Sequence, residues 1–255
     1  MNVVRKKKAY SKDRESAFKL AKELYPLIKK WANPYLWYII PSGSYAKLTS
    51  IKGLADIDLF ISLKTQMPYT LKEIYNSLYE YFDSYHYHSF FPRKQNVSIR
   101  IKYRGINVDL VPAKRMPNAT YSHSIYVRKG KPWTKTNIQK HILIVRNSRR
   151  MSEIVLMKIW RELNKLDFPS FYLELSIIEA LKGRHVGIGN LEKNIIVVFE
   201  YLIRRFQYAR IFDPANSQNV ISKDLSDSEK REIIEAAKST LVSYIKKSCW
   251  TDIIW

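Results

Sequence analysis

The sequence predicts an α+β protein in which a small mixed β-sheet is followed by a helical region. Three observations support this prediction. An apolar run over residues 56–63 carries two aspartates one residue apart, which the alternation of a strand places on one face. Residues 97–112 alternate on either side of Arg104-Gly105, which is typical of a β-hairpin. Beyond residue 137 the apolar residues recur with helical spacing.

The elements before the hairpin follow in chain order. Residues 11–32 have the apolar spacing of an amphipathic helix. The apolar run over residues 36–40 indicates a strand that leads into a turn at Gly43-Ser44. Residues 56–63 are the next predicted strand, and residues 71–83 are predicted to form a second helix before the hairpin completes the sheet.

A polar connector follows the hairpin and marks the predicted domain boundary. It contains Pro117, Asn118, Gly130 and Pro132, which favour turns over regular structure. We therefore expect a sheet domain over residues 1–116 and a helical domain over residues 117–255. The helices expected in the second domain span residues 137–147, 152–165, 170–182, 191–208 and 226–247. The last of these begins with a capping box, in which Ser226 is followed by Glu229.

Asp56, Asp58 and Asp109 are the candidate catalytic residues. Asp56 and Asp58 would project from one face of a strand, where two carboxylates repel each other and lose hydration. A bound divalent cation reverses that cost, so a metal site explains the pair better than stability does. Asp109 lies mid-strand between two apolar residues, where a carboxylate is equally hard to explain by stability alone. The alternatives are a solvated turn for the pair and an arginine partner for Asp109.

The order of these residues resembles the signature of the polymerase-beta-like nucleotidyltransferases. That signature is a Gly-Ser turn, here Gly43-Ser44, then Asp-x-Asp, here Asp56 and Asp58, then a third carboxylate on a neighbouring strand, here Asp109. Segments 133–137, 168–174 and 211–220 add a likeness to one branch of this superfamily. The branch holds archaeal-type CCA-adding enzymes, oligoadenylate synthases and the bacterial cyclic-oligonucleotide synthases (CD-NTases). The likeness covers roughly residues 10–245.

The resemblance implies a palm-like catalytic domain, a helical domain and a nucleotide cleft between them. In this family two Mg²⁺ ions, for which Mn²⁺ is an accepted replacement, are held by the three aspartates, with Asp109 on the ion that activates the hydroxyl. Gly43 would let the backbone approach a triphosphate, and Ser44 would offer it hydrogen bonds. The remaining nucleotide-binding candidates are Lys47, Lys158, Phe171, Tyr172 and Gln218. Lys158 has an alternative role as an exposed helix residue, and Phe171 as a core aromatic.

Net charge is the second strong clue in the sequence. The chain has 44 Lys and Arg against 23 Asp and Glu, a formal net charge of +21. Such an excess attracts polyanions, so we expect a nucleic-acid partner, although each basic cluster alone is explained by a solvated face. The candidate nucleic-acid-binding residues are Arg128, Lys129, Lys131, Arg149, Arg150, Arg204 and Arg205.

Other sequence features indicate the cellular compartment in which the protein works. Cys249 is the only cysteine, which excludes an internal disulfide and suits a reducing compartment. The basic start, Met1–Lys8, lacks the apolar segment of a secretory signal. No apolar run approaches the ~20 residues that a membrane span requires. We therefore expect a cytoplasmic protein that is not membrane-bound. The sequence leaves the oligomeric state open.

The predicted activity is transfer of a nucleotide from a nucleoside triphosphate to a hydroxyl group, with release of pyrophosphate. The first hypothesis is that the acceptor is an RNA 3′ end of the tRNA type, because the basic surface suits RNA. The alternative is a CD-NTase-like or oligoadenylate-synthase-like enzyme that makes a second messenger, activated by nucleic acid in antiviral defence. Gln218 favours the alternative, because CCA-adding enzymes carry an arginine there. A third hypothesis, a degenerate nucleotide-binding module, is opposed by the three retained carboxylates.

Overall fold

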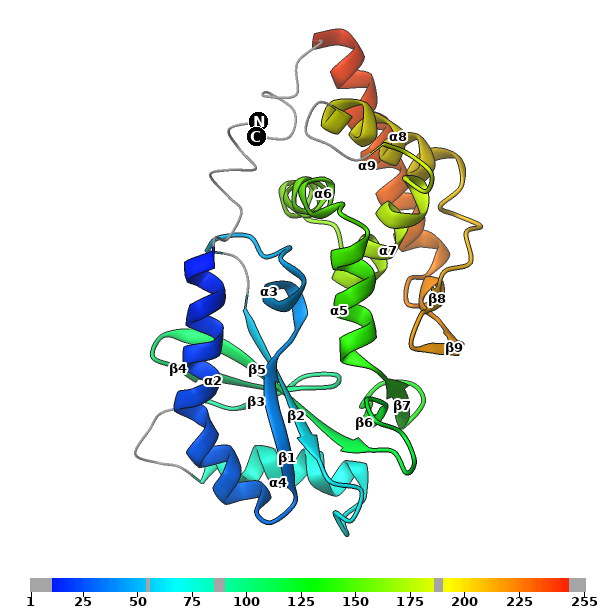
Figure 1. Cartoon of the computed structure of the whole chain (residues 1–255). Helices are drawn as coiled ribbons and strands as arrows, with labels where there is room; N and C mark the ends of the chain where they lie inside the picture. The colour runs from blue at the N-terminus through cyan, green and yellow to red at the C-terminus, as the bar shows by residue number, and fades with distance from the viewer. Residues whose placement is uncertain (1–10, 54–55, 85–89, 186–189, 248–255) are drawn as a thin grey trace. The chain divides into compact units, whose positions relative to one another are not determined.

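The computed structural model describes residues 11–53, 56–84, 90–185 and 190–247. These residues divide into two compact units, one that ends at Leu143 and one that begins at Ile144 (Figure 1). The sequence had placed the division after residue 116. The sheet unit extends further than that because the predicted polar connector contains two strands, β6 and β7, that lengthen the sheet.

The sheet unit is built around a mixed sheet with strand order β1-β2-β5-β4-β3. The strands β6 and β7 extend it, because β6 pairs with the end of β5 and β7 pairs with β6. Only the pairing of β2 with β5 is parallel among the described strands. The elements of this unit are α2 (Ser11–Ala32), β1 (Leu36–Pro41), α3 (Gly43–Lys47), β2 (Ile57–Leu63), α4 (Leu71–Asp83), β3 (Arg93–Lys94), β4 (Ile99–Tyr103), β5 (Ile106–Arg115), β6 (His123–Tyr126) and β7 (Trp133–Thr136).

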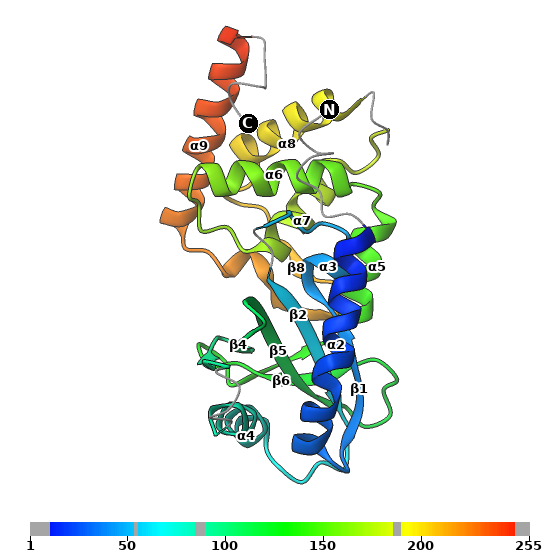
Figure 2. The same ribbon diagram turned by 90° about the vertical axis from the view of Figure 1, so that its left-hand side faces the viewer.

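The two faces of the sheet have different neighbours. Helices α2 and α4 lie along one face (Figure 2), and their apolar side chains share a core with Ile57, Leu59 and Ile61 of β2. Because side chains alternate along a strand, Asp58 and Phe60 point to the opposite face. There Phe60 packs with Ala113 and Ile125 in a smaller cluster. The alternation that leaves Asp58 outside the main core thus follows directly from the apolar pattern of β2.

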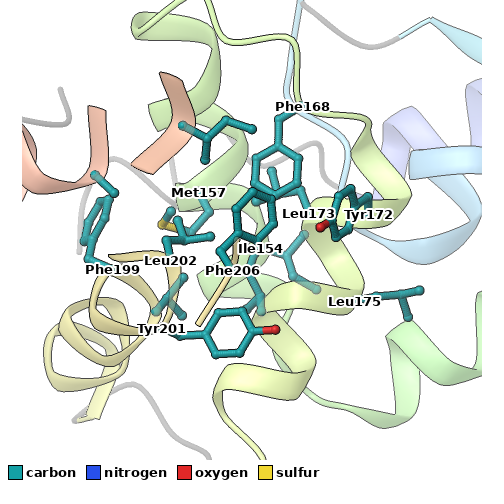
Figure 3. Packing of buried hydrophobic residues seen from close by; sticks show 14 of the residues in the cluster. Ile154, Met157, Phe168, Tyr172, Leu173, Leu175, Phe199, Tyr201, Leu202 and Phe206 are labelled. Carbon is teal, nitrogen blue, oxygen red and sulfur yellow. The ribbon is translucent and has the colours of Figure 1, made fainter. Parts of the chain in front are cut away.

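The second unit is helical, as the sequence predicted. Its core gathers the aromatic side chains of three helices and the segment after α8, including Trp160. Figure 3 shows Tyr172, Phe199 and Phe206 of this core. The indole Nε1–H of Trp160 donates to Thr240 Oγ1 at 2.9 Å, which anchors the last helix to this core. The elements are α5 (Ile138–Asn147), which runs across the division, α6 (Met151–Leu163), α7 (Ser170–Ala180), α8 (Leu191–Arg204), β8 (Phe212–Asp213), β9 (Asn216–Val220), a 3₁₀ turn (Ile221–Lys223) and α9 (Asp227–Lys247).

Local sequence signals located most helices well. The capping box at Ser226 is present, because Ser226 Oγ accepts from the Glu229 N–H at 3.3 Å and the Ser226 N–H donates to Glu229 Oε2 at 2.6 Å. Helix α8 ends at Arg204, four residues before the predicted 208, and the short strands β8 and β9 were not expected. Among the helices of the described residues, none combines the length and apolar character that crossing a membrane requires.

His123 of β6 is a buried titratable group in the sheet. Its Nε2 lies 2.7 Å from Ser62 Oγ, and Phe60 packs edge-on against its ring with centroids 5.0 Å apart. Burial lowers the pKa of His123 below its usual value of 6.5, with a smaller lowering from Arg115 and an opposing hydrogen bond to the Tyr121 carbonyl. The neutral imidazole is therefore the form that the folded sheet accommodates.

We expect His123 to make the sheet unit less stable in mild acid. Its folded pKa lies below the unfolded value, so as the pH falls below about 6.5 the unfolded chain takes up the proton first. This one group can lower the free energy of unfolding by up to about 1.4 kcal/mol per pH unit. Thermal unfolding of wild type and His123→Gln at about pH 8 and about pH 5.5 measures the effect. The acid-induced drop in Tm should be smaller in the variant, and an equal drop in both proteins would contradict this assignment.

Candidate active site

Asp58 and Asp109 lie directly opposite each other on the parallel strands β2 and β5. Both belong to positions that alternate away from the core under α2 and α4, so their carboxyl groups share the other face of the sheet. Asp56 comes one residue before β2. Its Oδ1 accepts from Asn107 Nδ2 at 3.2 Å, which ties this carboxylate to the start of β5. The structure therefore brings the three predicted aspartates to one end of the β2–β5 pair.

The Gly43 turn packs against the carboxyl group of Asp58. The Ser42 N–H donates to the Asp58 carbonyl at 2.7 Å, which fixes the turn to β2. Gly43 has a φ of +55°, and a Cβ built on it would lie 1.7 Å from Asp58 Oδ2. Only a residue without a side chain leaves room for that carboxylate. The Gly-Ser element and the Asp-x-Asp element of the sequence signature are therefore in direct contact.

Arg100 is a further member of this cluster. It lies opposite Asp109 on β4 and donates to both carboxylate oxygens, from Nε to Oδ1 at 2.9 Å and from a terminal nitrogen to Oδ2 at 2.8 Å. The same terminal nitrogen lies 2.6 Å from Asp56 Oδ2. These hydrogen bonds to Asp109, with the nearby charges of Asp109, Asp56 and Asp58, raise the pKa of Arg100 above its usual value despite partial burial. A guanidinium thus bridges two of the three aspartates.

The donor set fits a hard divalent cation, but the arrangement holds a guanidinium. Carboxylate oxygens are the ligands that Mg²⁺ prefers, and Gly43 leaves the Asp58 carboxylate space beside the turn. Across the described ranges, no three His, Cys, Asp or Glu side chains converge as a ready metal site. In this arrangement Arg100 engages both oxygens of Asp109 and one oxygen of Asp56, so these carboxylates already have a cationic partner.

Two other predicted nucleotide-binding residues follow Gly43 in the short helix α3. Ser44 is half-buried, and its carbonyl accepts from the Thr49 N–H at 2.9 Å. Lys47, which the sequence suggested as a phosphate ligand, is buried, with 7% of its surface exposed. Helix α3 packs against β2 and α2, so the last turn of this helix faces protein.

The predicted nucleotide-binding residues of the helical unit are mostly internal. Lys158 Nζ donates to Glu174 Oε1 at 2.7 Å, and both side chains are buried, so the alternative of an exposed helix residue is wrong. Tyr172 is fully buried between Phe168 and Phe206, with its ring stacked on Phe206 at 5.1 Å. It is a core residue and not a pocket wall. Phe171 is half-buried and packs against the same core.

Gln218 lies exposed on β9, in the hairpin that carries the predicted base-binding loop. The turn of this hairpin is organised by Asp213, which is buried and accepts from the Ala215 N–H at 2.8 Å. Asn219 Nδ2 donates to the same carboxylate at 3.4 Å. The acidic residue of this loop therefore shapes the turn, while Gln218 faces solvent.

The predicted nucleic-acid-binding residues separate into exposed and structural groups. The prediction that Arg150 contacts nucleic acid is wrong, because only 4% of its surface is exposed. Its side chain pairs with Glu153 at 3.3 Å and donates to the carbonyls of Leu181, Arg184 and His185. It closes the end of α7 from inside the unit. The exposed group consists of Arg128, Lys129, Lys131, Arg149, Arg204 and Arg205.

Arg100 is the residue that sequence reasoning missed. The signal was present, because a two-residue turn at Arg104-Gly105 fixes the hairpin register and places Arg100 opposite Asp109. An arginine partner was considered for Asp109, but no particular arginine was named. The contact from Arg100 to Asp56 had no comparable signal, because it depends on the pairing of β2 with β5 across the intervening helix α4.

Comparisons with known proteins identify a domain family and solved structures that this chain resembles. Residues 27–148 match the family model of the Second Messenger Oligonucleotide or Dinucleotide Synthetase domain. The chain is 23% identical to a Cyclic AMP-AMP-AMP synthase of Escherichia coli (strain MS 115-1), over 88% of this chain and 81% of that protein. Its fold resembles E. coli MS115-1 CdnC in a CdnC:HORMA-deltaN complex, with a TM-score of 0.77, 20% identity and coverage of 98% and 94% of the two chains.

A second solved structure supports the same relationship. The CD-NTase CdnG of Bradyrhizobium diazoefficiens, in complex with GTP, matches with a TM-score of 0.75 and 12% identity over 97% of this chain and 91% of that chain. These similarities support the predicted polymerase-beta-like nucleotidyltransferase superfamily, which includes the bacterial CD-NTases, and with it the predicted nucleotidyl-transfer activity.

We expect Gly43→Ala to disrupt the cluster more than its backbone strain alone explains. An alanine at a φ of +55° costs roughly 1–2 kcal/mol wherever it occurs. Here the new methyl group would also collide with Asp58 Oδ2, so the carboxylate or the turn must move. Nucleotidyl transfer should fall by about 100-fold or more, since displacement of a reacting group by 1 Å has that effect.

Gly105→Ala provides the matched control. Gly105 has a φ of +79°, lies in the β4–β5 turn and has open space where its Cβ would be. Thermal unfolding should show a loss of stability in both variants, whereas the large loss of activity should occur only in Gly43→Ala. Equal activities in the two variants would show that the Gly43 turn does not position Asp58.

Proposed function

We propose that this chain joins nucleoside triphosphates into a small cyclic or linear oligonucleotide second messenger. The observation that carries the proposal is the similarity, over most of both chains, to a protein named Cyclic AMP-AMP-AMP synthase. The match of residues 27–148 to a second-messenger synthetase domain supports the same function. ATP is the first substrate to test, because a solved structure of E. coli CdnC with ATP has a similar fold.

Transfer to an RNA 3′ end, the first hypothesis from the sequence, is not supported. The family model and the relatives reported above belong to second-messenger synthases and CD-NTases. The basic surface had favoured RNA as the acceptor, but a positive field attracts an activating nucleic acid equally well. The acceptor in the proposed reaction is therefore the hydroxyl group of another nucleotide.

The reaction forms one phosphodiester bond at a time. The ribose hydroxyl oxygen of one nucleotide attacks the α-phosphorus of a triphosphate, and the bond from that phosphorus to the bridging oxygen of the pyrophosphate breaks. Asp56, Asp58 and Asp109 would hold two Mg²⁺ ions, which would stabilise the charge on the attacking and leaving oxygens. Asp109 is the proposed acceptor of the hydroxyl proton, after Arg100 has released one of its oxygens.

The Gly43 turn is the proposed triphosphate support. Its backbone packs beside the Asp58 carboxylate without an intervening side chain. The N–H groups of Gly43 and Ser44 and the Ser44 hydroxyl are the proposed donors to the triphosphate. Lys47, Lys158, Phe171 and Gln218 stay predictions as nucleotide contacts. Of these, Lys158 carries the least free charge, because Glu174 neutralises it within the core.

The exposed basic residues of the sheet unit are the proposed nucleic-acid contacts. Arg128, Lys129 and Lys131 lie on the β6–β7 loop, where the Lys129 N–H donates to Asn96 Oδ1 at 2.9 Å and Arg128 donates to the Lys94 carbonyl at 2.9 Å. These hydrogen bonds hold the loop while its charges face solvent. A cytoplasmic setting, in which triphosphates are abundant, is part of the same proposal.

The purified protein should convert labelled nucleoside triphosphates and Mg²⁺ into a small product that resists phosphatase, without added RNA. Asp58→Asn should lower the rate by about 10³-fold or more, because it removes one carboxylate from the charge-stabilising set. Thin-layer chromatography of products from α-labelled triphosphates measures both results. A set of reactions with total RNA tests the other acceptor, since label on RNA in place of the small product would contradict the proposal.

Asp83→Asn is the matched control for that variant. Asp83 is exposed at the end of α4, so this substitution removes the same charge at a position outside the β2–β5 pair. Its rate should stay within about twofold of wild type, as is usual for surface substitutions. Wild-type turnover by Asp58→Asn would remove the aspartate cluster from the mechanism.

Arg100→Met should increase the thermal stabilisation that a divalent cation gives. The guanidinium competes for oxygens of Asp56 and Asp109, so its removal lets the cation bind more tightly. A tenfold gain in affinity corresponds to about 1.4 kcal/mol, or a further rise of about 3–6 °C in Tm for a chain of this size. The measurement is the Tm with Mn²⁺ minus the Tm with EDTA, in wild type and variant.

Arg104→Met is the control for this experiment. Arg104 lies in the turn of the same hairpin, at the far end of β4 from Arg100, and pairs with Glu23 at 3.0 Å. Its metal-induced rise in Tm should match that of wild type. If Arg100→Met also matches wild type, then Arg100 does not compete with the cation.

A further inference from the structure

The helical unit contains a pocket of about 680 Å³ that the aspartate cluster does not use. It is lined by α7, the end of α8 and the segment over residues 208–214. Pockets of 300–1,000 Å³ are typical of sites for small ligands, and a nucleotide falls within that range. We propose that this pocket is a second nucleotide-binding site, which holds a phosphate group on its arginines and a base against its aromatic rings.

The charge of the pocket favours an anion. Arg204, Arg205 and Arg210 line it and are exposed, and Glu179 is the only carboxylate in the lining. Within the described part of the chain, no carboxylate lies within ion-pair distance of these three arginines. A guanidinium group suits a phosphate group, because its planar donors match two oxygens at once.

Arginines with structural roles in this chain differ from these three because they have hydrogen-bond or ion-pair partners within the protein. Arg100 is bound by Asp109, and Arg150 pairs with Glu153 while it closes the end of α7. Arg161 pairs with Glu162 and also donates to the Phe168 carbonyl. Each of these side chains therefore has an internal partner, whereas no described carboxylate pairs with the three arginines of the pocket.

The aromatic side chains of the pocket favour a base over a bare anion. Tyr208 is 87% exposed and Phe212 is 44% exposed, although both are large rings that usually bury much of their surface. The Arg210 guanidinium lies 5.4 Å from the Phe212 ring centre, so charge and ring face are presented together. Stacking on exposed rings is how proteins bind bases without regard to their sequence.

Tyr201 adds an unused hydrogen-bond donor in the pocket wall. Its side chain is 9% exposed, and its hydroxyl oxygen is buried with no hydrogen-bond partner among the described residues. Figure 3 shows the Tyr201 ring at the edge of the core, with its hydroxyl on the side where Leu175, another lining residue, lies. Burial raises the pKa of Tyr201 to about 12, so the group is a neutral donor at physiological pH. A ligand oxygen would satisfy it.

A direct test is binding of a fluorescent, 5′-phosphorylated triadenylate in the presence of EDTA. Without divalent cation there is no turnover, so the result does not depend on the proposed synthase activity. The double variant Arg204→Gln/Arg205→Gln should bind about tenfold or more weakly, because charge-assisted contacts to phosphate are lost. Arg231→Gln/Lys246→Gln removes the same charge from exposed positions of α9 and should change affinity by less than about twofold.

Tyr201→Phe separates a ligand contact from a structural role. Removal of an unpaired buried hydroxyl should leave Tm unchanged or raise it, whereas affinity for the triadenylate should fall by about 2- to 10-fold. A variant with unchanged affinity would remove the hydroxyl from the site and count against the proposal.

A labelled 20-nucleotide strand tests whether the ligand is a free nucleotide or a nucleotide within a nucleic acid. If the Arg204→Gln/Arg205→Gln variant binds the triadenylate more weakly than wild type, the ligand is a free nucleotide or short oligonucleotide. If wild type binds only the 20-nucleotide strand and the variant binds that strand more weakly, the ligand is a nucleotide unit within nucleic acid. Equal affinities of the pocket variant and the α9 control for both probes would overturn the proposal.

Discussion

The parallel pairing of β2 with β5 is the constraint on which the candidate active site depends. It sets Asp58 opposite Asp109, although 50 residues of chain and the helix α4 separate them. Because β2 alternates strictly, the same register sends Leu59 and Ile61 into the core and leaves the carboxylates on the other face. A shift by one residue would exchange these two sets. The apolar core under α2 and α4 thus fixes the register that gathers the charges.

Gathering these charges has an electrostatic consequence that Arg100 only partly offsets. Three carboxylates and one guanidinium leave two formal negative charges if all four groups are ionised. Arg100 engages Asp109 and Asp56, while the Gly43 turn presses against Asp58. The cluster is therefore ordered but not neutral. Such a net charge attracts divalent cations, and in the proposed mechanism Arg100 would compete with them at two of the three carboxylates.

Local patterns in the sequence predicted the helices and the hairpin, and they failed where long-range packing decides. The turn at Arg104-Gly105 fixes the pairing of Arg100 with Asp109, because hairpin register is a local property, so this contact could have been read from the sequence although it was not named. The parallel β2–β5 contact is not local and was inferred only through the family resemblance. Arg149 and Arg150 are adjacent in sequence, yet one is exposed and the other buried. No local signal separates them, because the carbonyls that bind Arg150 come from the end of α7.

The positive charge of the chain is better understood from its partners than from its total. An excess of +21 predicts attraction to polyanions in general, but it does not say where they bind. Arg100 and Arg150 contribute to that excess and are committed to internal acceptors. Arg204, Arg205 and Arg210 surround one pocket with exposed aromatic rings and a single acidic group. Because these charges converge on one pocket, the ligand that we propose for it would be selected there, while scattered lysines only raise its local concentration.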